Sequence, residues 1–405
     1  MASEWKKHRI KDVLSFVVDN RGKTPPTQDE GHMLLEVNAV SATEKFPLYR
    51  EVRKHVSQEV YDTCFRKGHP QKGDILVPTV GTLGAVSLMD RDDCCIAQNL
   101  IAIRCNEAIC HSHFLYYVLC NPMTRKRLLN LNIGGVQPSI KVPHLMELEI
   151  ALPSIREQKK IAELLSLLDD KIFCNKRIND NLQQQLRAIF MERFTNNPAL
   201  ESIQQVPLSE LCSVVTKGTT PTTLGKPFVD RGINFLKAES ILDNHSIDKG
   251  KFAHIDEETH DMLKRSVIYA GDIVFTIAGT LGRFALIDSD ILPANTNQAV
   301  AIIRADKGKI SPEYLYACFI GNWHNDYYSK RVQQAVQANL SLTTIKSLPI
   351  PVLTQDEMVS YMALISPIIR MLKQNEKENE RLASMRNSLL SYLISGEIVV
   401  SSIPF

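Results

Sequence analysis

The sequence predicts an α+β protein in which two similar globular domains are separated by two long antiparallel helices that pair as a coiled coil. Three observations lead to this fold class: an internal repeat, short apolar segments bounded by turns in each copy, and a heptad pattern after each copy. The expected globular domains are 1–154 and 201–353, and the expected helical regions are 155–200 and 354–405.

Composition limits the number of domains and the classes of protein to consider. A chain of 405 residues is long enough for two or three domains, and 44% hydrophobic with 23% charged residues is typical of globular proteins. The net charge of +2 means that a nucleic-acid partner would require basic groups gathered on one face. The opening MASEWKKHRI lacks the apolar stretch of a signal peptide, and no apolar run is long enough to span a bilayer. A cytoplasmic protein is expected.

The nine cysteines are placed irregularly, and no C-x-x-C motif occurs. We expect reduced and mostly buried thiols. A metal site formed by Cys105, Cys110, His111 and His113 is the alternative, although it lacks the close ligand pairs that such sites usually have.

The repeat has a period of about 200 residues. Gly-Asp-Ile-Leu at 73–76 recurs as Gly-Asp-Ile-Val at 271–274, and Gly-Thr-Leu-Gly at 81–84 recurs at 279–282. After this block the second copy contains two additional residues, so the later matches are 200 positions apart. Later matches are Gln98 with Gln298, Ile103-Arg104 with Ile303-Arg304, Leu115-Tyr116 with Leu315-Tyr316, and Val136-Gln137 with Val336-Gln337. The loops differ, since Ala85 stands where the second copy has Arg283. A duplicated scaffold with divergent loops suits two related readers of different targets.

Each copy is expected to mix short strands with helices. Apolar runs that follow a Gly-Asp turn read as buried strands, and Ser311 before Pro312 is a good helix N-cap. The expected strands are 75–77, 85–89 and 100–104 in the first copy, and 273–275, 284–287 and 299–304 in the second. The expected helices are 114–119 and 312–319.

The segment 155–194 contains neither Gly nor Pro and carries a heptad pattern. Its pairing positions are Leu165, Leu168, Ile172, Asn175, Asn179, Leu182, Leu186 and Ile189. The second copy repeats them as Ile365, Ile368, Leu372, Asn375, Asn379, Leu382 and Leu389. Pro367 is expected to kink that helix or to delay its start.

Asn at mid-seam positions in both helices has two interpretations. Buried Asn penalises slipped pairings and so fixes register, whereas Asn facing solvent at a frayed stretch would have no such role. A paired helix of roughly 35 residues is about 50 Å long. That length is compatible with half-sites one turn of B-DNA apart, roughly 34–36 Å. Lengthening the helix at 174–182 should therefore lengthen the spacer between two half-sites.

Over essentially its whole length, the chain resembles the specificity (S) subunit of type I restriction-modification systems. The resemblance rests on the repeated Gly-Asp-Ile and Gly-Thr-Leu-Gly blocks, on Gly-x-Thr-Pro at 22–25 and 218–221, and on the segments 150–161, 350–359 and 389–398. The order of these blocks, duplicated at this period, is what makes the resemblance specific. The chain departs from the pattern at 354–356, where the Glu-Gln of the first copy is not repeated in place.

The resemblance implies two target-recognition domains, each reading one half of a split, asymmetric site in double-stranded DNA. It also implies that the paired helices dock two modification (M) subunits, which would carry S-adenosylmethionine and methylate adenine N6. Restriction (R) subunits would join through the complex and supply cleavage driven by ATP and Mg²⁺. The S chain itself would hold no cofactor or metal and no catalytic residue.

The motifs of the catalytic subunits are missing from the sequence. An amino-methyltransferase needs an Asn/Asp-Pro-Pro-aromatic loop, which neither 121–123 nor 197–199 provides. The phosphate-binding G-x-x-x-x-G-K-[ST] motif does not occur, and no nuclease-like cluster of acids with Lys stands out. The sequence thus predicts a non-catalytic subunit.

Direct readout of DNA needs polar side chains on loops, with basic residues fixing the register through phosphates. The candidates in the first copy are Arg21, Lys23, Thr24, Gly81, Thr82, Gln98, Asn99, Gln137 and Lys141. Those in the second copy are Lys217, Thr219, Thr220, Gly279, Thr280, Arg283, Asn297, Gln298, Gln337 and Lys346. Ordinary turn geometry is the alternative for the glycine loops, and an internal hydrogen bond is the alternative for Gln98 and Gln298.

Three other functions remain open at this point. The chain could serve a related restriction class in which one fused enzyme cuts and methylates, or it could be a coiled-coil adaptor that binds proteins and not DNA. It could also be an enzyme whose site is not recognisable in the sequence. A gel-shift assay with the M subunit present separates the adaptor from the DNA reader.

Overall fold

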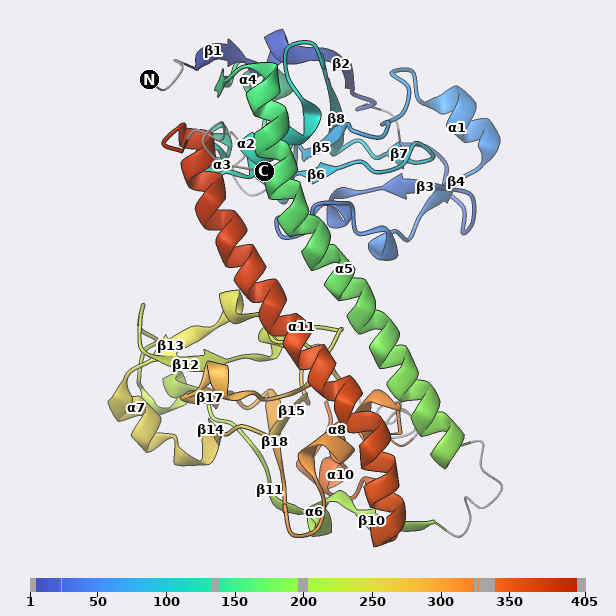
Figure 1. The fold of residues 1–405 in the computed structure, drawn as a ribbon, viewed down its shortest axis with the longest axis vertical. Helices are drawn as coiled ribbons and strands as arrows, with labels where there is room; N and C mark the ends of the chain where they lie inside the picture. The colour runs from blue at the N-terminus through green and yellow to red at the C-terminus, as the bar shows by residue number, and fades with distance from the viewer. Residues whose placement is uncertain are drawn as a thin grey trace. The chain divides into compact units, whose positions relative to one another are not determined.

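The computed structural model describes residues 5–22, 24–132, 138–195, 203–323, 327 and 339–398. The chain divides into two compact units (Figure 1). Unit 1 comprises residues 1–173 and 378–405, and unit 2 comprises residues 174–377. Each unit therefore contains part of both long helices, α5 (Ile155–Phe194) and α11 (Gln355–Ser395). Among the described residues, no helix is long and apolar enough to cross a bilayer.

In the described part of the chain, unit 1 is built on three small sheets. The central one is antiparallel with the order β2-β8-β5-β6, beside a β4-β3-β7 sheet and a β1-β9 pair. The strands are β1 (Lys6–Arg9), β2 (Leu14–Val18), β3 (His32–Leu35), β4 (His55–Val56), β5 (Ile75–Pro78), β6 (Ser87–Leu88), β7 (Cys95–Ile96), β8 (Leu100–Cys105) and β9 (Glu149–Leu152). The short helices are α1 (Gln58–Cys64), α2 (Ser112–Cys120), α3 (Pro122–Leu129) and α4 (Val142–Met146).

Unit 2 repeats this topology and adds a strand, β14, to its second sheet. Its sheets have the orders β11-β18-β15-β16, β13-β12-β17-β14 and β10-β19. The strands are β10 (Gln204–Pro207), β11 (Cys212–Lys217), β12 (Ile233–Leu236), β13 (Ala253–Ile255), β14 (Val267–Ile268), β15 (Ile273–Thr276), β16 (Phe284–Leu286), β17 (Ala294–Thr296), β18 (Val300–Ala305) and β19 (Pro349–Val352). The helices are α6 (Leu208–Leu211), α7 (Glu257–Met262), α8 (Pro312–Ile320) and α10 (Leu342–Lys346). The duplicated α+β fold read from the sequence is therefore confirmed.

The strands form where apolar runs follow the Gly-Asp turns. All four residues of β5 and all four of β15 are buried, as expected for central strands. The expected helices 114–119 and 312–319 lie within α2 and α8, and Ser311 accepts a hydrogen bond from the Tyr314 amide as an N-cap. The strand expected at 85–89 is shorter, since β6 covers two residues.

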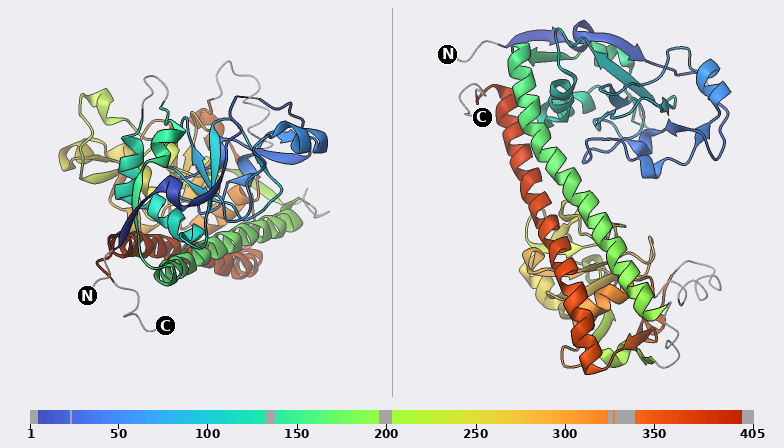
Figure 2. Two further views of the ribbon diagram at one scale, coloured as in Figure 1. Left: turned by 90° about the horizontal axis from the view of Figure 1, so that it is seen from above. Right: turned by 45° about the vertical axis from the view of Figure 1, so that its right-hand side comes forward.

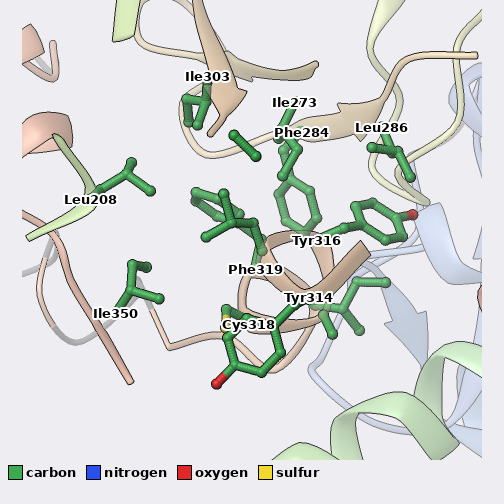
Figure 3. Packing of buried hydrophobic residues seen from close by; sticks show 14 of the residues in the cluster. Leu208, Ile273, Phe284, Leu286, Ile303, Tyr314, Tyr316, Cys318, Phe319 and Ile350 are labelled. Atoms are coloured by element: carbon green, nitrogen blue, oxygen red, sulfur yellow. The ribbon is translucent and has the colours of Figure 1, made fainter. Parts of the chain in front are cut away.

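The core of unit 2 packs aromatic side chains of α8 against the central sheet (Figure 3). The ring of Phe284 on β16 lies 5.4 Å from that of Phe319 and 5.9 Å from that of Tyr316, centroid to centroid. The same cluster includes Leu186 and Phe190 of α5 and Ile365 and Ile369 of α11. Burial of this apolar surface fixes the long helices to the globular part of the unit.

The long helices pair antiparallel in each unit, α5 running opposite to α11 (Figures 1 and 2). In unit 1, Asp169 contacts Arg386, and Lys171 contacts Glu378. In unit 2, Asn179 contacts Asn375, and Arg193 contacts Glu357. Residue numbers rise along α5 as they fall along α11. The heptad pattern predicted that these helices pair, and the family resemblance implied that they pair antiparallel.

Two details of α11 differ from expectation. Pro367 does not delay the helix, because α11 begins twelve positions earlier and Pro367 lies inside it. The proline occupies an exposed position, and its neighbours Ile365 and Ile369 are buried, so packing offsets the hydrogen bond that proline cannot make. The two copies also differ less at 354–356 than expected, because the glutamate of the first copy is retained at position 357. Glu357, equivalent to Glu157, accepts a hydrogen bond from the Thr354 hydroxyl at the helix start.

Candidate nucleic-acid interface

The candidate loops leave the ends of the central strands in each unit. The loop after β5 carries Gly81 with φ +87°, and the loop after β15 carries Gly279 with φ +76°. This left-handed conformation favours glycine, so the turn reading of the Gly-Thr-Leu-Gly block is correct for its backbone. Gly81, Thr82, Gly279 and Thr280 are nevertheless exposed, and they remain accessible to a ligand.

Unit 1 has a cavity of about 460 Å³ beside its candidate residues. Thr24, Gln98 and Asn99 line it, together with Asn38 and Lys54. The Lys54 ammonium group lies 2.8 Å from Glu36, which balances its charge. Amide, hydroxyl and ammonium groups that converge on one hollow provide both donors and acceptors, which is what the recognition of base edges requires.

At the equivalent place in unit 2, the candidate side chains make internal hydrogen bonds. The Thr220 hydroxyl donates a hydrogen bond to the Gln298 side-chain oxygen, and Arg265 donates one to Thr219 over 3.1 Å. A Cβ added at Gly218 would clash with the Thr296 carbonyl, so glycine is required by the close approach of two backbone segments. For Gln298 the structure shows the internal hydrogen bond that was the alternative to base contact.

Two of the candidate arginines are held by aspartates. Arg283 binds Asp243 with two hydrogen bonds of 2.6 and 2.7 Å, and it also reaches the Ile241 carbonyl. Arg21 binds Asp19 in the same bidentate way at 2.8 and 2.7 Å. The hydrogen bonds from Arg21 hold the pKa of the Asp19 carboxyl below its ordinary value. Both guanidinium groups therefore shape their loops in this structure.

The candidate lysines stand at the ends of elements. Lys217 ends β11, Lys141 is the N-cap residue of α4, and Lys346 ends α10, and all three are exposed. The amide of Asn297 closes a local turn by accepting from the Ala299 N–H over 3.2 Å. Lys23, Gln137 and Gln337 lie outside the described residues.

The predicted helix-pairing residues are arranged along the facing sides of α5 and α11. Leu165, Ile172, Asn175, Leu182, Leu186, Ile365, Leu372 are buried, and Leu168, Asn179, Ile189, Ile368, Asn375, Asn379, Leu382 and Leu389 are half-buried. Asn375 donates a hydrogen bond of 2.7 Å to the Asn179 oxygen, and Asn179 donates to the Leu372 carbonyl. A hydrogen bond between seam asparagines is the contact that register control would use.

Sequence reasoning missed an Asp–Arg ion pair that occurs in the central sheet of each unit. Arg104 binds Asp74 at 2.9 and 2.8 Å, and Arg304 binds Asp272 at 2.7 Å through both oxygens. The Asp side chains are 2% and 1% exposed. The signal was present, because the Asp of each Gly-Asp block and the Arg of each Ile-Arg block recur in register.

Within the described residues, no three His, Cys, Asp or Glu side chains gather as a metal site would require. The cysteines of the alternative metal site, Cys105 and Cys110, belong to the apolar core of unit 1. Burial lowers the pKa of nearby His113 to about 4, and Lys45 contributes to the shift. These residues act as packing groups in this structure.

The fold defines a class of protein: a tandem duplication in which each copy joins an α+β domain to one long helix. Residues 2–184 and 201–382 match the type I restriction modification DNA specificity domain, and the chain therefore belongs to this family. It is 22% identical to the type I restriction enzyme MjaIX specificity subunit of Methanocaldococcus jannaschii, over 99% of this chain and 95% of that one.

Further relatives agree. The HindI specificity subunit of Haemophilus influenzae is 21% identical over 81% of this chain and 87% of its own length. The crystal structure of a type I restriction-modification S subunit from M. genitalium has a TM-score of 0.50 and 17% identity, with 96% of each chain covered. That similarity supports the duplicated fold.

Proposed function

We propose that this chain is the DNA-reading subunit of a type I restriction-modification complex, with each unit inspecting one half of a bipartite asymmetric site. The observation that carries the proposal is the duplication itself. The two units share the strand order of the central sheet and its Asp–Arg pair, whereas their loops differ in side chains and contacts. Two scaffolds alike in the core and unlike at the loops suit two different half-sites.

The long helices would dock the M subunits and, through them, the R subunits. Large apolar side chains are exposed on them, including Leu167 on α5 and Val359 and Leu364 on α11, at 58%, 61% and 60% exposure. Apolar residues in such positions suit burial against a partner protein. Leu364→Glu should weaken association with the M subunit, and Gln374→Glu on the same helix is the matched control. Equal effects would remove the support for this surface.

The chain would contribute recognition and no chemistry. S-adenosylmethionine is expected in the M subunits, and ATP with Mg²⁺ in the R subunits, because the sequence lacks the motifs that hold them. A chain that methylated or cut DNA without those partners would contradict this part of the proposal.

Binding to a random DNA pool in the presence of the M subunit tests the proposal. Gel shift followed by sequencing of the bound fraction should recover a motif with two specified halves and an unspecified spacer. A protein adaptor would yield no enriched motif. A single undivided motif would contradict the two-reader arrangement. A specificity subunit of a related restriction class would yield the same kind of motif but a different partner, a fused enzyme that both cuts and methylates.

The spacer offers a second test. Four-residue insertions in α5 at 174–182 and in α11 at 374–382 would add about 6 Å to each helix and keep the pair in step. Methylation mapping should then show a longer spacer between unchanged half-sites. The same insertion at 196–202, between α5 and β10, is the control and should leave the spacer unaltered.

A further inference from the structure

A buried polar trio connects α2, α5 and α11 within unit 1. The Tyr117 hydroxyl donates to Asp169 over 2.6 Å, and Arg386 donates to the other oxygen of Asp169 over 2.6 Å. The side chains of Asp169 and Arg386 are 4% and 20% exposed. Asp169 and Arg386 stand on opposite helices, so this ion pair joins α5 directly to α11.

The repeat-equivalent positions in unit 2 are all apolar. With the offset of 200 that relates the two helices, Tyr117 corresponds to Ala317, Asp169 to Ile369 and Arg386 to Leu186. These three residues are 0%, 3% and 0% exposed, and they belong to one hydrophobic cluster. Unit 1 thus has an ion pair between the helices where unit 2 has Leu186 and Ile369.

This asymmetry matters because α5 and α11 are copies of one helix. A duplicated seam allows a helix to pair with a second copy of itself as readily as with its sister, as in two-fold homodimers. In an antiparallel pair of two α5 helices, Asp169 would face Leu186 of the other copy at both ends. In a pair of two α11 helices, Arg386 would face Ile369. Each self-pair would bury charges without a partner, which is strongly unfavourable.

We propose that Tyr117, Asp169 and Arg386 form a pairing lock that makes α5 select α11 over a second α5, and α11 select α5 over a second α11. The lock acts by penalising the wrong partner and not mainly by stabilising the right one. Replacing a whole buried ion pair by apolar residues often leaves stability unchanged. Partner choice, and not stability, is therefore the property to measure. The proposal concerns helix pairing and does not depend on DNA binding.

In the intact chain α5 and α11 are covalently linked, which favours their pairing. The test therefore cuts the chain between them. A protease site is placed at 196–202, the full chain is purified folded, and it is then cut into an N half and a C half. After unfolding and refolding of the mixture, native mass spectrometry counts N·N, N·C and C·C complexes. The count is repeated on halves co-expressed in cells, so that it does not rest on refolding alone. The wild type should give almost entirely N·C.

Two variants should change the distribution of complexes in different ways. Tyr117→Phe/Asp169→Ile/Arg386→Leu makes unit 1 apolar like unit 2, and the preference for N·C should fall about tenfold or more toward the statistical mixture. Leu186→Arg gives α5 its own partner for Asp169, and N·N should become the main species. Leu186→Met, which conserves volume, is the control and should keep the wild-type distribution.

The proposal is overturned if wild-type halves mix statistically, or if the apolar variant keeps the wild-type preference. It is also overturned if Leu186→Arg still gives N·C without any gain in N·N. Circular dichroism of each nicked variant accompanies the count. If the triple variant unfolds, it is replaced by Arg386→Leu/Asp169→Leu, for which the same loss of preference is expected.

Discussion

Units 1 and 2 share a scaffold and differ in the loops that we propose read DNA. Both have a central sheet of four antiparallel strands and an Asp–Arg pair that joins the start of its third strand to its second. In unit 1, Gln98 lines an open cavity, whereas in unit 2 Gln298 is bonded to Thr220. Unit 2 also anchors a loop through Arg283 and Asp243, where unit 1 has Ala85. The two copies thus share the central sheet and its Asp–Arg pair, whereas the contacts of their loops differ.

The largest expected effect concerns the feature that the units share. Asp74→Ala and Asp272→Ala each leave a partly buried arginine without its carboxylate, and each should lower the free energy of unfolding by about 3–5 kcal/mol. Urea denaturation checks this. Glu147→Gln, which breaks the exposed contacts with Arg9 and Lys11, is the control and should change little. A strong effect in one unit alone would show that the shared pair is not equally important.

Acid should lower the stability of both units over the same pH range. Burial lowers the pKa of His113 in unit 1 and of His245 in unit 2 to about 4. Their unfolded pKa is near 6.5, so the unfolded chain binds more protons between these values. The stability that the neutral imidazoles contribute is complete above about pH 6.5 and is lost as the pH falls toward 4.

The variant His245→Phe should flatten this pH dependence in unit 2 and leave unit 1 unchanged. Hydrogen exchange at several pH values, followed by peptide, resolves the two units. Equal flattening in both would mean that the transition is not local to the buried histidines.

The anchored loop of unit 2 gives a smaller and more selective prediction. Because Arg283 is bonded to Asp243, Arg283→Ala and Asp243→Ala should weaken specific DNA binding to a similar degree, and the double variant should be no weaker than either single one. The salt dependence of binding should stay the same. A larger loss for Arg283→Ala, with a shallower salt slope, would instead indicate direct contact with phosphate.

Lys217 carries the smallest expected effect. It is exposed at the end of β11, and Lys217→Ala should weaken binding to all sequences alike and reduce the salt slope by about one. Fluorescence anisotropy at several salt concentrations measures both quantities. A change in the preferred sequence with the slope unchanged would contradict a phosphate contact.

The sequence predicted the architecture well because the patterns that indicate it occur in two copies. The Gly-Asp strands and both heptad seams follow from local patterns that recur in register. The Ser311 cap follows from a local pattern of the second copy alone. Side-chain partners were less predictable. Nothing local distinguishes Gln98 from Gln298, because whether each faces a cavity or binds Thr220 depends on loops far away in sequence. Asp169 was missed because the heptad pattern selects its apolar neighbour Leu168, which is half-buried, whereas Asp169 is buried.

Pro367 shows the limit of local rules in the other direction. Proline disfavours helix interiors, yet buried neighbours on both sides keep α11 continuous through it. Tertiary packing decided the outcome, and no single-residue preference could have predicted it.

The central claim is that each unit reads its own half of the DNA site. Methylation mapping of two variants in complex with the M subunit, Gln98→Ala and Gln298→Ala, tests it most directly. The account predicts that Gln98→Ala relaxes the sequence that is specified at one half-site. Gln298→Ala should change the sequence that is specified at the other half-site alone. Relaxation of both halves by either variant would contradict it.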